Sequence, residues 1–194
     1  MPMPSTVDIV NKKILAKAWG TLFEYVIAFR RRDGTIQNLV REVYDHGNAA
    51  AILLIDPKRR VLTLVRQFRL PAHLAGDDGQ MLEICAGLLD GDAPETCARK
   101  EALEETGIAP ATLTHAFDIY ASPGSLSEKT HCFIGTYSPA SRVGTGGGLD
   151  HEGEDIEIVE IGFSQALRLI DTGAIMDAKT VATIQHAALT GMLS

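Results

Sequence analysis

The stretch AGLLDGDAPETCARKEALEETGI, residues 86–108, is the part of this 194-residue chain that decides its fold. It begins with a glycine-rich turn and continues as a predicted helix. Asp92 is a suitable N-cap, Pro94 suits the first helical turn, and Gly107 is a natural C-terminal stop. The sequence therefore predicts a tight turn that leads directly into a helix.

Three carboxylates of this helix, Glu101, Glu104 and Glu105, are predicted to share one face, because residues three and four apart are neighbours on a helix. Like charges at this spacing repel each other and destabilise the isolated helix. Solvated surface glutamates are one interpretation. The glycine turn before the helix and Gly107 after the carboxylates favour a metal site, since Mg²⁺ takes carboxylate oxygens together with water and phosphates.

Composition narrows the possible partners. The formal net charge is -7 and no block of Lys or Arg occurs, which argues against a nucleic-acid partner. An acidic protein can still bind a small anion through a bridging cation. Three cysteines without a Cys-x-x-Cys pair indicate a reducing compartment, and we expect a cytoplasmic protein without a signal peptide. The longest apolar run, residues 49–55, is too short to span a membrane.

Strand-like runs surround the central stretch, and several of them are joined as hairpins. Residues 71–79 are predicted to form a polar loop, and residues 144–155, rich in glycine and acid, a mobile loop. The C-terminal tail is predicted to be helical, with Val181, Ile184 and Ala188 in the core. This order favours a mixed α/β layer structure. Strands are predicted at residues 23–30, 36–43, 49–55, 61–69, 81–86, 113–122, 130–137 and 156–162.

The central stretch resembles the Nudix box. The first half of this signature is a glycine, any five residues and a glutamate. After any seven residues, its second half reads Arg-Glu-apolar-x-Glu-Glu-x-Gly-apolar. Residues 101–108 match the second half. The first half departs from the box, because only four residues separate Gly87 from Asp92, aspartate stands for glutamate, and Lys100 stands for arginine. These departures concern the shape of the turn more than the predicted metal ligands.

The resemblance covers nearly the whole chain and is strongest to the ADP-ribose and GDP-mannose pyrophosphatase branch of the family. Pro123, sixteen residues after Gly107, marks this branch, and the shortened turn and the Gly146–Gly148 loop are similar to the GDP-mannose members. The resemblance implies the Nudix fold, with mixed β-sheet layers between helices. It also implies an antiparallel β extension at residues 1–45 that forms a homodimer, followed by a hydrolase domain at residues 46–194.

The resemblance further implies the site residues. The metal ligands would be Glu101, Glu105, Glu154 and the backbone carbonyl of Ala86, with Mg²⁺ as the ion and Mn²⁺ as a substitute. The catalytic set would be Glu101, Glu105, Glu152 and Glu154, and either of the last two could take the proton of the attacking water. Substrate contacts would come from Trp19, Arg41, Glu42, Arg69, Ala86, Gly87, Glu128 and Lys179.

Structural roles are the competing interpretations of these residues. Trp19 could belong to the core, and Arg41 and Arg69 could pair with acids instead of phosphate. Glu128 could be solvated, and Lys179 could be a helix-end charge. The residue before Arg41 is Val40, where the related proteins carry a basic residue. The six histidines are scattered without metal-ligand spacing, and surface or hairpin roles are expected for them.

The resulting hypothesis is metal-assisted hydrolysis of a nucleotide sugar, with GDP-mannose giving GMP and mannose 1-phosphate. One alternative is the same chemistry on ADP-ribose, giving AMP and ribose 5-phosphate. Another is a sensor that binds a nucleotide sugar without cutting it.

Overall fold

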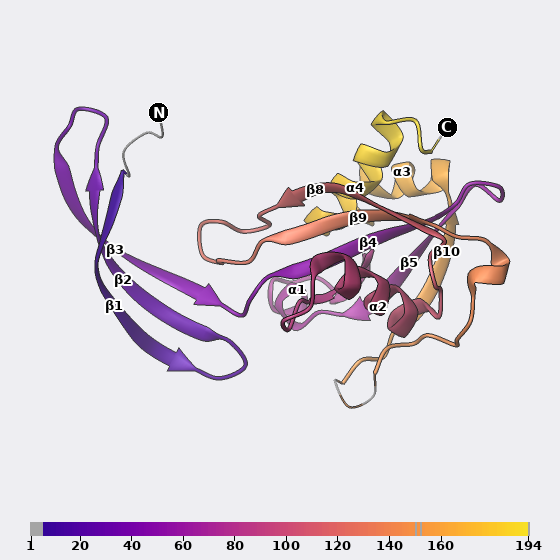
Figure 1. Ribbon diagram of the computed structural model, residues 1–194, viewed down its shortest axis with the longest axis horizontal. Helices are drawn as coiled ribbons and strands as arrows, with labels where there is room; N and C mark the ends of the chain where they lie inside the picture. Colours follow the sequence, from indigo (N-terminus) through magenta and orange to yellow (C-terminus); the bar gives the residue numbers. More distant parts are fainter. Residues whose placement is uncertain (1–5, 150, 152, 194) are drawn as a thin grey trace. The chain divides into compact units, whose positions relative to one another are not determined.

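The computed structural model describes residues 6–149, 151 and 153–193, which divide into two compact units (Figure 1). One unit contains the N-terminal segment up to Gly47 together with Tyr120–Glu128. The other contains Asn48–Ile119 and the chain from Lys129 onward. The segment Tyr120–Glu128 therefore leaves the second unit after one strand and returns to it at the start of the next.

The N-terminal unit is built on a three-stranded antiparallel sheet of β1 (Val7–Lys17), β2 (Thr21–Arg30) and β3 (Ile36–Asp45). The β2–β3 turn is held by Asp33, whose Oδ1 accepts hydrogen bonds from the backbone and side chain of Thr35. The sequence pattern does not predict β1, because two register shifts interrupt its pairing with β2 and break the alternation of side chains.

The second unit is built on a sheet with strand order β10-β5-β4-β9-β8, and β6 and β7 pair with β5 and β4. The pairing of β4 with β9 is parallel, whereas the other strand pairs are antiparallel. The strands are β4 (Ala49–Asp56), β5 (Val61–Phe68), β6 (Gln80–Glu83), β7 (Cys85–Leu88), β8 (Thr112–Ile119), β9 (Thr130–Thr136) and β10 (Glu157–Gly162).

Helices cover both faces of this sheet, as Figure 1 shows. On one face, α2 (Pro94–Thr106) packs Cys97, Ala98 and Ala102 against alternate residues of β4. On the other face, α3 (Phe163–Asp171) and α4 (Ala178–Leu189) pack through residues that include Ala166 and Ile184. The strand β4 is buried along its whole length because it is covered from both sides. The predicted fold class is thus confirmed.

Several local boundaries differ from the sequence predictions. Pro94 is the first residue of α2, so Ala93 takes the N-cap position and the prediction of Asp92 as the cap is wrong by one residue. A short helix, α1 (Leu70–Leu74), lies in the segment predicted as a loop. The strand predicted at residues 81–86 is divided at Ile84 into β6 and β7, which pair with different neighbours. Among the described residues, no helix combines the length and the apolar character needed to cross a membrane.

Candidate active site

The turn before α2 places Glu101 directly against β7. A Cβ atom built on Gly87 would lie 2.3 Å from Oε1 of Glu101, far inside contact distance. A glycine at this position therefore allows the carboxylate to lie against the strand backbone. The neighbouring residue in β7 is Ala86, whose carbonyl is the predicted fourth metal ligand. The glycine before the helix and the carboxylate on the helix therefore occur together because the two groups are in contact.

Glu105 lies one turn further along α2 and is buried, with 2% of its surface exposed. Its Oε2 atom is enclosed without a hydrogen-bond partner among the described residues. Burial and the negative charge of Glu101 raise the pKa of Glu105 to about 8, and Glu154 acts in the same direction. The carboxylate is therefore desolvated and faces two like charges.

Glu104 does not share this environment, although the sequence pattern predicts one common face. Its side chain lies 3.8 Å from the ammonium group of Lys100, one helical turn earlier, and is 26% exposed. The helix turns by about 100° per residue, so Glu104 and Glu105 diverge in the folded protein. The structure associates Glu105 with Glu101 and leaves Glu104 as a partner of Lys100.

The glycine-rich loop is attached to the end of α2. The backbone amides of Gly147 and Gly148 donate to the carbonyls of Glu105 and Glu104, at 2.9 and 3.2 Å. Gly146 approaches so closely that a Cβ atom there would lie 2.6 Å from the backbone of Thr106. This first part of the segment that is predicted to be a mobile loop thus satisfies carbonyls that the helix end leaves open.

The same loop positions Glu154, which is half-buried. Its Oε2 accepts a hydrogen bond of 2.9 Å from the backbone amide of Leu149, and it packs against Gly148, where a Cβ atom would lie 2.7 Å away. The loop thus folds back on itself and brings this carboxylate within electrostatic range of Glu105. The other predicted loop carboxylate, Glu152, lies outside the described residues.

The carboxylates of this site fit a divalent cation. Oε2 of Glu105 has no hydrogen-bond partner among the residues that the structure describes, and burial together with the negative charge of Glu101 raises the pKa of this acid. A hard cation would satisfy both, because it binds carboxylate oxygens and favours their ionised form. Glu101 and Glu154 are two further carboxylates whose negative charges act on Glu105.

A second cluster joins Arg69 and Lys179 through the buried Glu83. Nε and Nη2 of Arg69 donate to the two oxygens of Glu83 at 2.8 and 3.1 Å, and Lys179 Nζ donates to Oε2 at 2.5 Å. Lys179 also pairs with Asp177 at 3.0 Å. Burial acts to raise the pKa of Glu83, but the two cations outweigh it and lower the pKa to about 2.

Arg69 and Lys179 are both held by ion pairs with Glu83, but they differ in exposure. Arg69 keeps 41% of its side chain exposed, so one side of the guanidinium remains accessible beyond the pair. Lys179 lies in the first turn of α4, where the helix dipole disfavours a positive charge, and its acidic partners compensate. Lys179 is therefore held in an ion-pair network and is not a solvated helix-end charge.

In the N-terminal unit, an aromatic group surrounds His46. Trp19 stacks on its ring with centroids 4.8 Å apart, and Tyr44 approaches at 5.5 Å. Glu128 lies 3.6 Å from Nε2 of the same imidazole. Trp19 is 73% exposed, so the interpretation of this residue as core is wrong. Two predicted substrate residues, Trp19 and Glu128, thus meet at one histidine that the sequence pattern did not single out.

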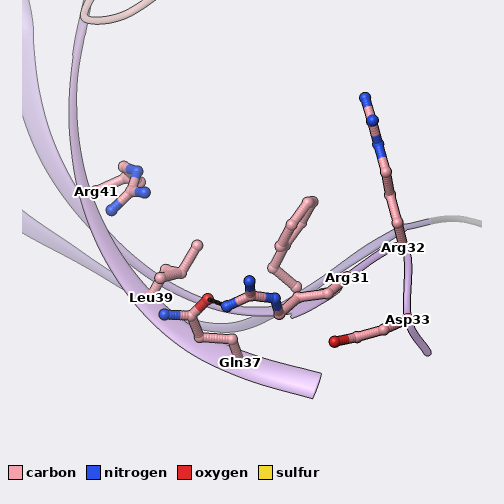
Figure 2. Close-up of a pocket in the computed structure, with 7 residues that line it drawn as sticks. Arg31, Arg32, Asp33, Gln37, Leu39 and Arg41 are labelled. Carbon is pink, nitrogen blue, oxygen red and sulfur yellow. Dashed lines mark hydrogen bonds between the residues drawn. The ribbon is translucent and has the colours of Figure 1, made fainter. Parts of the chain in front are cut away.

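The remaining predicted residues of this unit, Arg41 and Glu42, are exposed neighbours on β3. Successive residues of a strand point to opposite sides, so the two side chains face apart. Arg41 lines a pocket beside the β2–β3 turn, where Arg31 donates to Gln37 (Figure 2). Its own Nη1 donates to the carbonyl of Val40 at 2.8 Å.

Comparison with known proteins places this geometry in a family. The family described as the NUDIX domain matches residues 45–177, and that described as the GDP-mannose pyrophosphatase NudK N-terminal domain matches residues 6–44. The chain belongs to the Nudix family. It is 44% identical over 190 residues to a GDP-mannose pyrophosphatase of Pectobacterium atrosepticum, with 97% of each chain covered. A GDP-mannose pyrophosphatase of Escherichia coli O1:K1 is 43% identical, with 98% of this chain and 100% of the relative covered.

A solved structure supports the fold of this Nudix chain. An ADP compounds hydrolase superposes with a TM-score of 0.72 over 97% of this chain and 96% of that chain, at 19% identity. Together with the family match, these similarities establish a Nudix pyrophosphohydrolase, as predicted. The Nudix domain contains the carboxylate site, and the N-terminal match coincides with the sheet β1–β3.

The sequence pattern of this Nudix chain missed Glu83, Asp177 and His46. A usable signal existed for Glu83, which is a single acid within the apolar run MLEIC. An acid rarely becomes fully buried unless it is paired, so its presence there indicates buried cations elsewhere in the chain. For Asp177 and His46 the local sequence carries no such signal.

The contact of Gly87 with Glu101 gives a first prediction. We expect Gly87→Ala to fold normally, because the displaced atoms are the end of a flexible glutamate side chain. Catalysis should fall by about tenfold to a hundredfold, since a displacement of about 1 Å can cost that much. Steady-state kinetics and a thermal melt check this. Gly124→Ala is the control, because no atom of the described residues lies within 4 Å of its added Cβ. Unchanged turnover in Gly87→Ala would show that Glu101 acts from elsewhere.

Proposed function

We propose that this protein splits the diphosphate bond of a nucleoside diphosphate sugar with water, and that GDP-mannose is the substrate, giving GMP and mannose 1-phosphate. The observation that carries the proposal is the buried Glu105 carboxylate beside Glu101, whose Oε2 has no hydrogen-bond partner among the described residues. It occurs in a chain that aligns over nearly its whole length with relatives named GDP-mannose pyrophosphatase.

Metal ligands in this proposal are Glu101, Glu105, Glu154 and the carbonyl of Ala86. Mg²⁺, or Mn²⁺ in its place, would neutralise the diphosphate when bound and lower the pKa of a coordinated water. The chain itself fixes Glu101 against Gly87 and holds Glu105 out of water. Both arrangements support metal binding, because ligands that are already placed need no further ordering.

Substrate binding in this proposal uses the exposed part of Arg69. The guanidinium is oriented by its two bonds to Glu83, so its remaining donors are fixed in direction. A planar guanidinium suits phosphate oxygens in a forked arrangement. Lys179 adds positive charge to the same cluster, and Gly87 is a further proposed substrate contact, beside the Glu101 carboxylate.

The N-terminal unit contributes the other proposed substrate contacts, namely Trp19, Arg41, Glu42 and Glu128. Trp19 offers an exposed ring on which a nucleobase can stack. Glu128 offers a carboxylate that accepts hydrogen bonds from base or ribose. The proton of the attacking water goes to a loop carboxylate, Glu152 or Glu154, because the loop that carries them is hydrogen-bonded to the end of the helix that carries Glu105.

A substrate and metal panel tests this function. We expect Mg²⁺-dependent release of GMP from GDP-mannose, abolished by a chelator and restored by added Mg²⁺. ADP-ribose should be turned over more slowly in the same assay. Faster turnover of ADP-ribose would assign that substrate instead. Tight binding without product would indicate a nucleotide-sugar sensor, and full activity in excess chelator would contradict the metal mechanism.

We further propose that residues 1–45 form a dimerising extension and residues 46–194 the hydrolase domain. The sheet β1–β3 exposes apolar side chains, including Ile9, Val10 and Val40, that a monomer would leave in water. Light scattering should give the mass of a homodimer. Val10→Glu should shift the protein toward monomer, whereas Asp8→Glu, which keeps the charge of an exposed neighbour, should not. A monomer at all protein concentrations would contradict the proposal.

A further inference from the structure

Two histidines and an aspartate meet on the paired strands β8 and β9 of the second unit. Nε2 of His115 and Nδ1 of His131 each lie 2.8 Å from the same atom, Oδ1 of Asp118. All three ligand atoms lie within 4.8 Å of one another. The sequence pattern did not single out these histidines, because the pairing of β8 with β9 and not their spacing along the chain brings them together.

A β-bulge creates the cluster. Residues three apart on a regular strand point to opposite faces, so His115 and Asp118 should not meet. The pairing with β9 shifts between His115 and Phe117, which leaves Ala116 as an extra residue. Ala116 and Phe117 both pack into the core beneath α3 and α4. The alternation is thereby reset, and His115 and Asp118 emerge on the same face.

The pairing of β8 with β9 brings His131, the third residue of the cluster, next to Asp118. Asp118 lies directly opposite His131, and His115 lies opposite Phe133, whose ring it contacts edge-on at 5.4 Å. Phe133 belongs to the core on the α2 side, so the three polar residues lie on that side as well. Two paired strands are a rigid support, and rigid elements hold ligand geometry better than loops do.

We infer that His115, Asp118 and His131 form a second metal site, which takes a transition-metal dication of the Zn²⁺ class. Two imidazoles and one carboxylate suit Zn²⁺, Co²⁺ or Ni²⁺, whereas Mg²⁺ prefers oxygen ligands alone. The site is therefore chemically distinct from the proposed all-oxygen site around Glu101 and Glu105. His115 is 51% exposed, so an ion has direct access and water can complete the coordination.

The three ligand atoms already lie within 4.8 Å of one another, which is compatible with one shared ion. Metal–ligand bonds of about 2.0–2.1 Å at tetrahedral angles place ligand atoms about 3.4 Å apart. Each histidine nitrogen now lies 2.8 Å from Oδ1, so each contact must open by only about half an ångström. A bound ion takes the lone pairs of His115 Nε2 and His131 Nδ1, so each ring then carries its N–H proton on the other nitrogen. Nζ of Lys129 lies 3.9 Å from Oδ2 of Asp118, whereas both histidines contact the other oxygen, Oδ1.

The second site is separated from the first along the sheet. Gly87, Ala50, His131 and Asp118 occupy one row across four neighbouring strands. At about 4.8 Å per strand, the row places Asp118 about 14 Å from the glycine that contacts Glu101. The site also lies at the base of the segment Tyr120–Glu128, since Asp118 precedes it and His131 follows it. An ion here would tie together the two strands from which that segment leaves.

Equilibrium dialysis of the full chain against Zn²⁺, in excess Mg²⁺ to fill the carboxylate site, tests the inference. We expect one retained equivalent of Zn²⁺ and a loss of affinity of at least about tenfold in Asp118→Asn and His131→Ala, because even removal of an outer partner costs that much. His73→Ala, an exposed histidine outside the cluster, and Glu105→Gln should retain Zn²⁺ as the parent does.

The melting temperature and NMR spectra distinguish a loss of Zn²⁺ binding from a variant that fails to fold. Zn²⁺ should raise the melting temperature of the parent by mass action but not that of Asp118→Asn, and it should shift the ring-proton NMR signals of His115 and His131. No Zn²⁺ retained by the parent in excess Mg²⁺ would overturn the inference. Retention that is lost in Glu105→Gln and kept in His131→Ala would also overturn it, because the ion would then belong to the carboxylate site.

Discussion

Glu105→Gln should lower kcat/KM by about 10²–10³-fold, the usual loss when one electrostatic partner of the transition state is removed. The substitution keeps the size of a side chain that is buried and removes the charge that a cation would bind. It also removes an acid whose charged form is disfavoured by burial and by repulsion from Glu101 and Glu154, which together raise its pKa. The melting temperature measured without metal should therefore be unchanged or higher.

Glu104→Gln is the matched control on the same helix. Glu104 is more exposed and pairs with Lys100, so its replacement should change both catalysis and stability only slightly. Kinetics and thermal melts of the two variants, measured side by side, separate the roles. A Glu105→Gln protein that melts early and keeps its rate would show that Glu105 is structural.

Glu83→Gln should be the most destabilising of the substitutions considered, at about 3–5 kcal/mol. The change leaves Arg69 and Lys179 without the carboxylate that they share in a buried position. Denaturant unfolding measures the loss. Glu157→Gln is the control, because its pair with Arg66 is exposed and should contribute about 0–1 kcal/mol. Equal stability of the two variants would mean that solvent replaces Glu83 without cost.

The same acid should govern part of the pH dependence of stability. The pKa of Glu83 is about 2 in the folded protein, against an ordinary value of 4.5. A lowered pKa means that the stabilisation is fully present above pH 4.5 and is lost as the pH falls toward about 2. The shift corresponds to roughly 3 kcal/mol, at 1.36 kcal/mol per pKa unit. The unfolding free energy of the parent should therefore decrease as the pH is lowered from 4.5 to about 2. Glu83→Gln should lack the part of this decrease that comes from protonation of Glu83.

Local sequence was sufficient for the helix α2, its glycine stop, most of the strands and the family. These features depend on neighbours within a few residues, where periodicity and turn residues act directly. The separation of Glu104 from Glu105 was not predicted, because a helical pattern gives spacing but not the direction of the core. The helix also begins at Pro94, with Ala93 and not Asp92 at the N-cap position.

Tertiary structure alone decided the partners of the charged residues. Glu83 meets Arg69 across fourteen positions and Lys179 across ninety-six, and no local pattern joins them. The cluster of His115, Asp118 and His131 depends on one extra residue in β8, since a regular strand would send two of these side chains to opposite faces. A bulge is selected by the packing of Ala116 and Phe117 beneath the helices, which requires the whole sheet to be assembled.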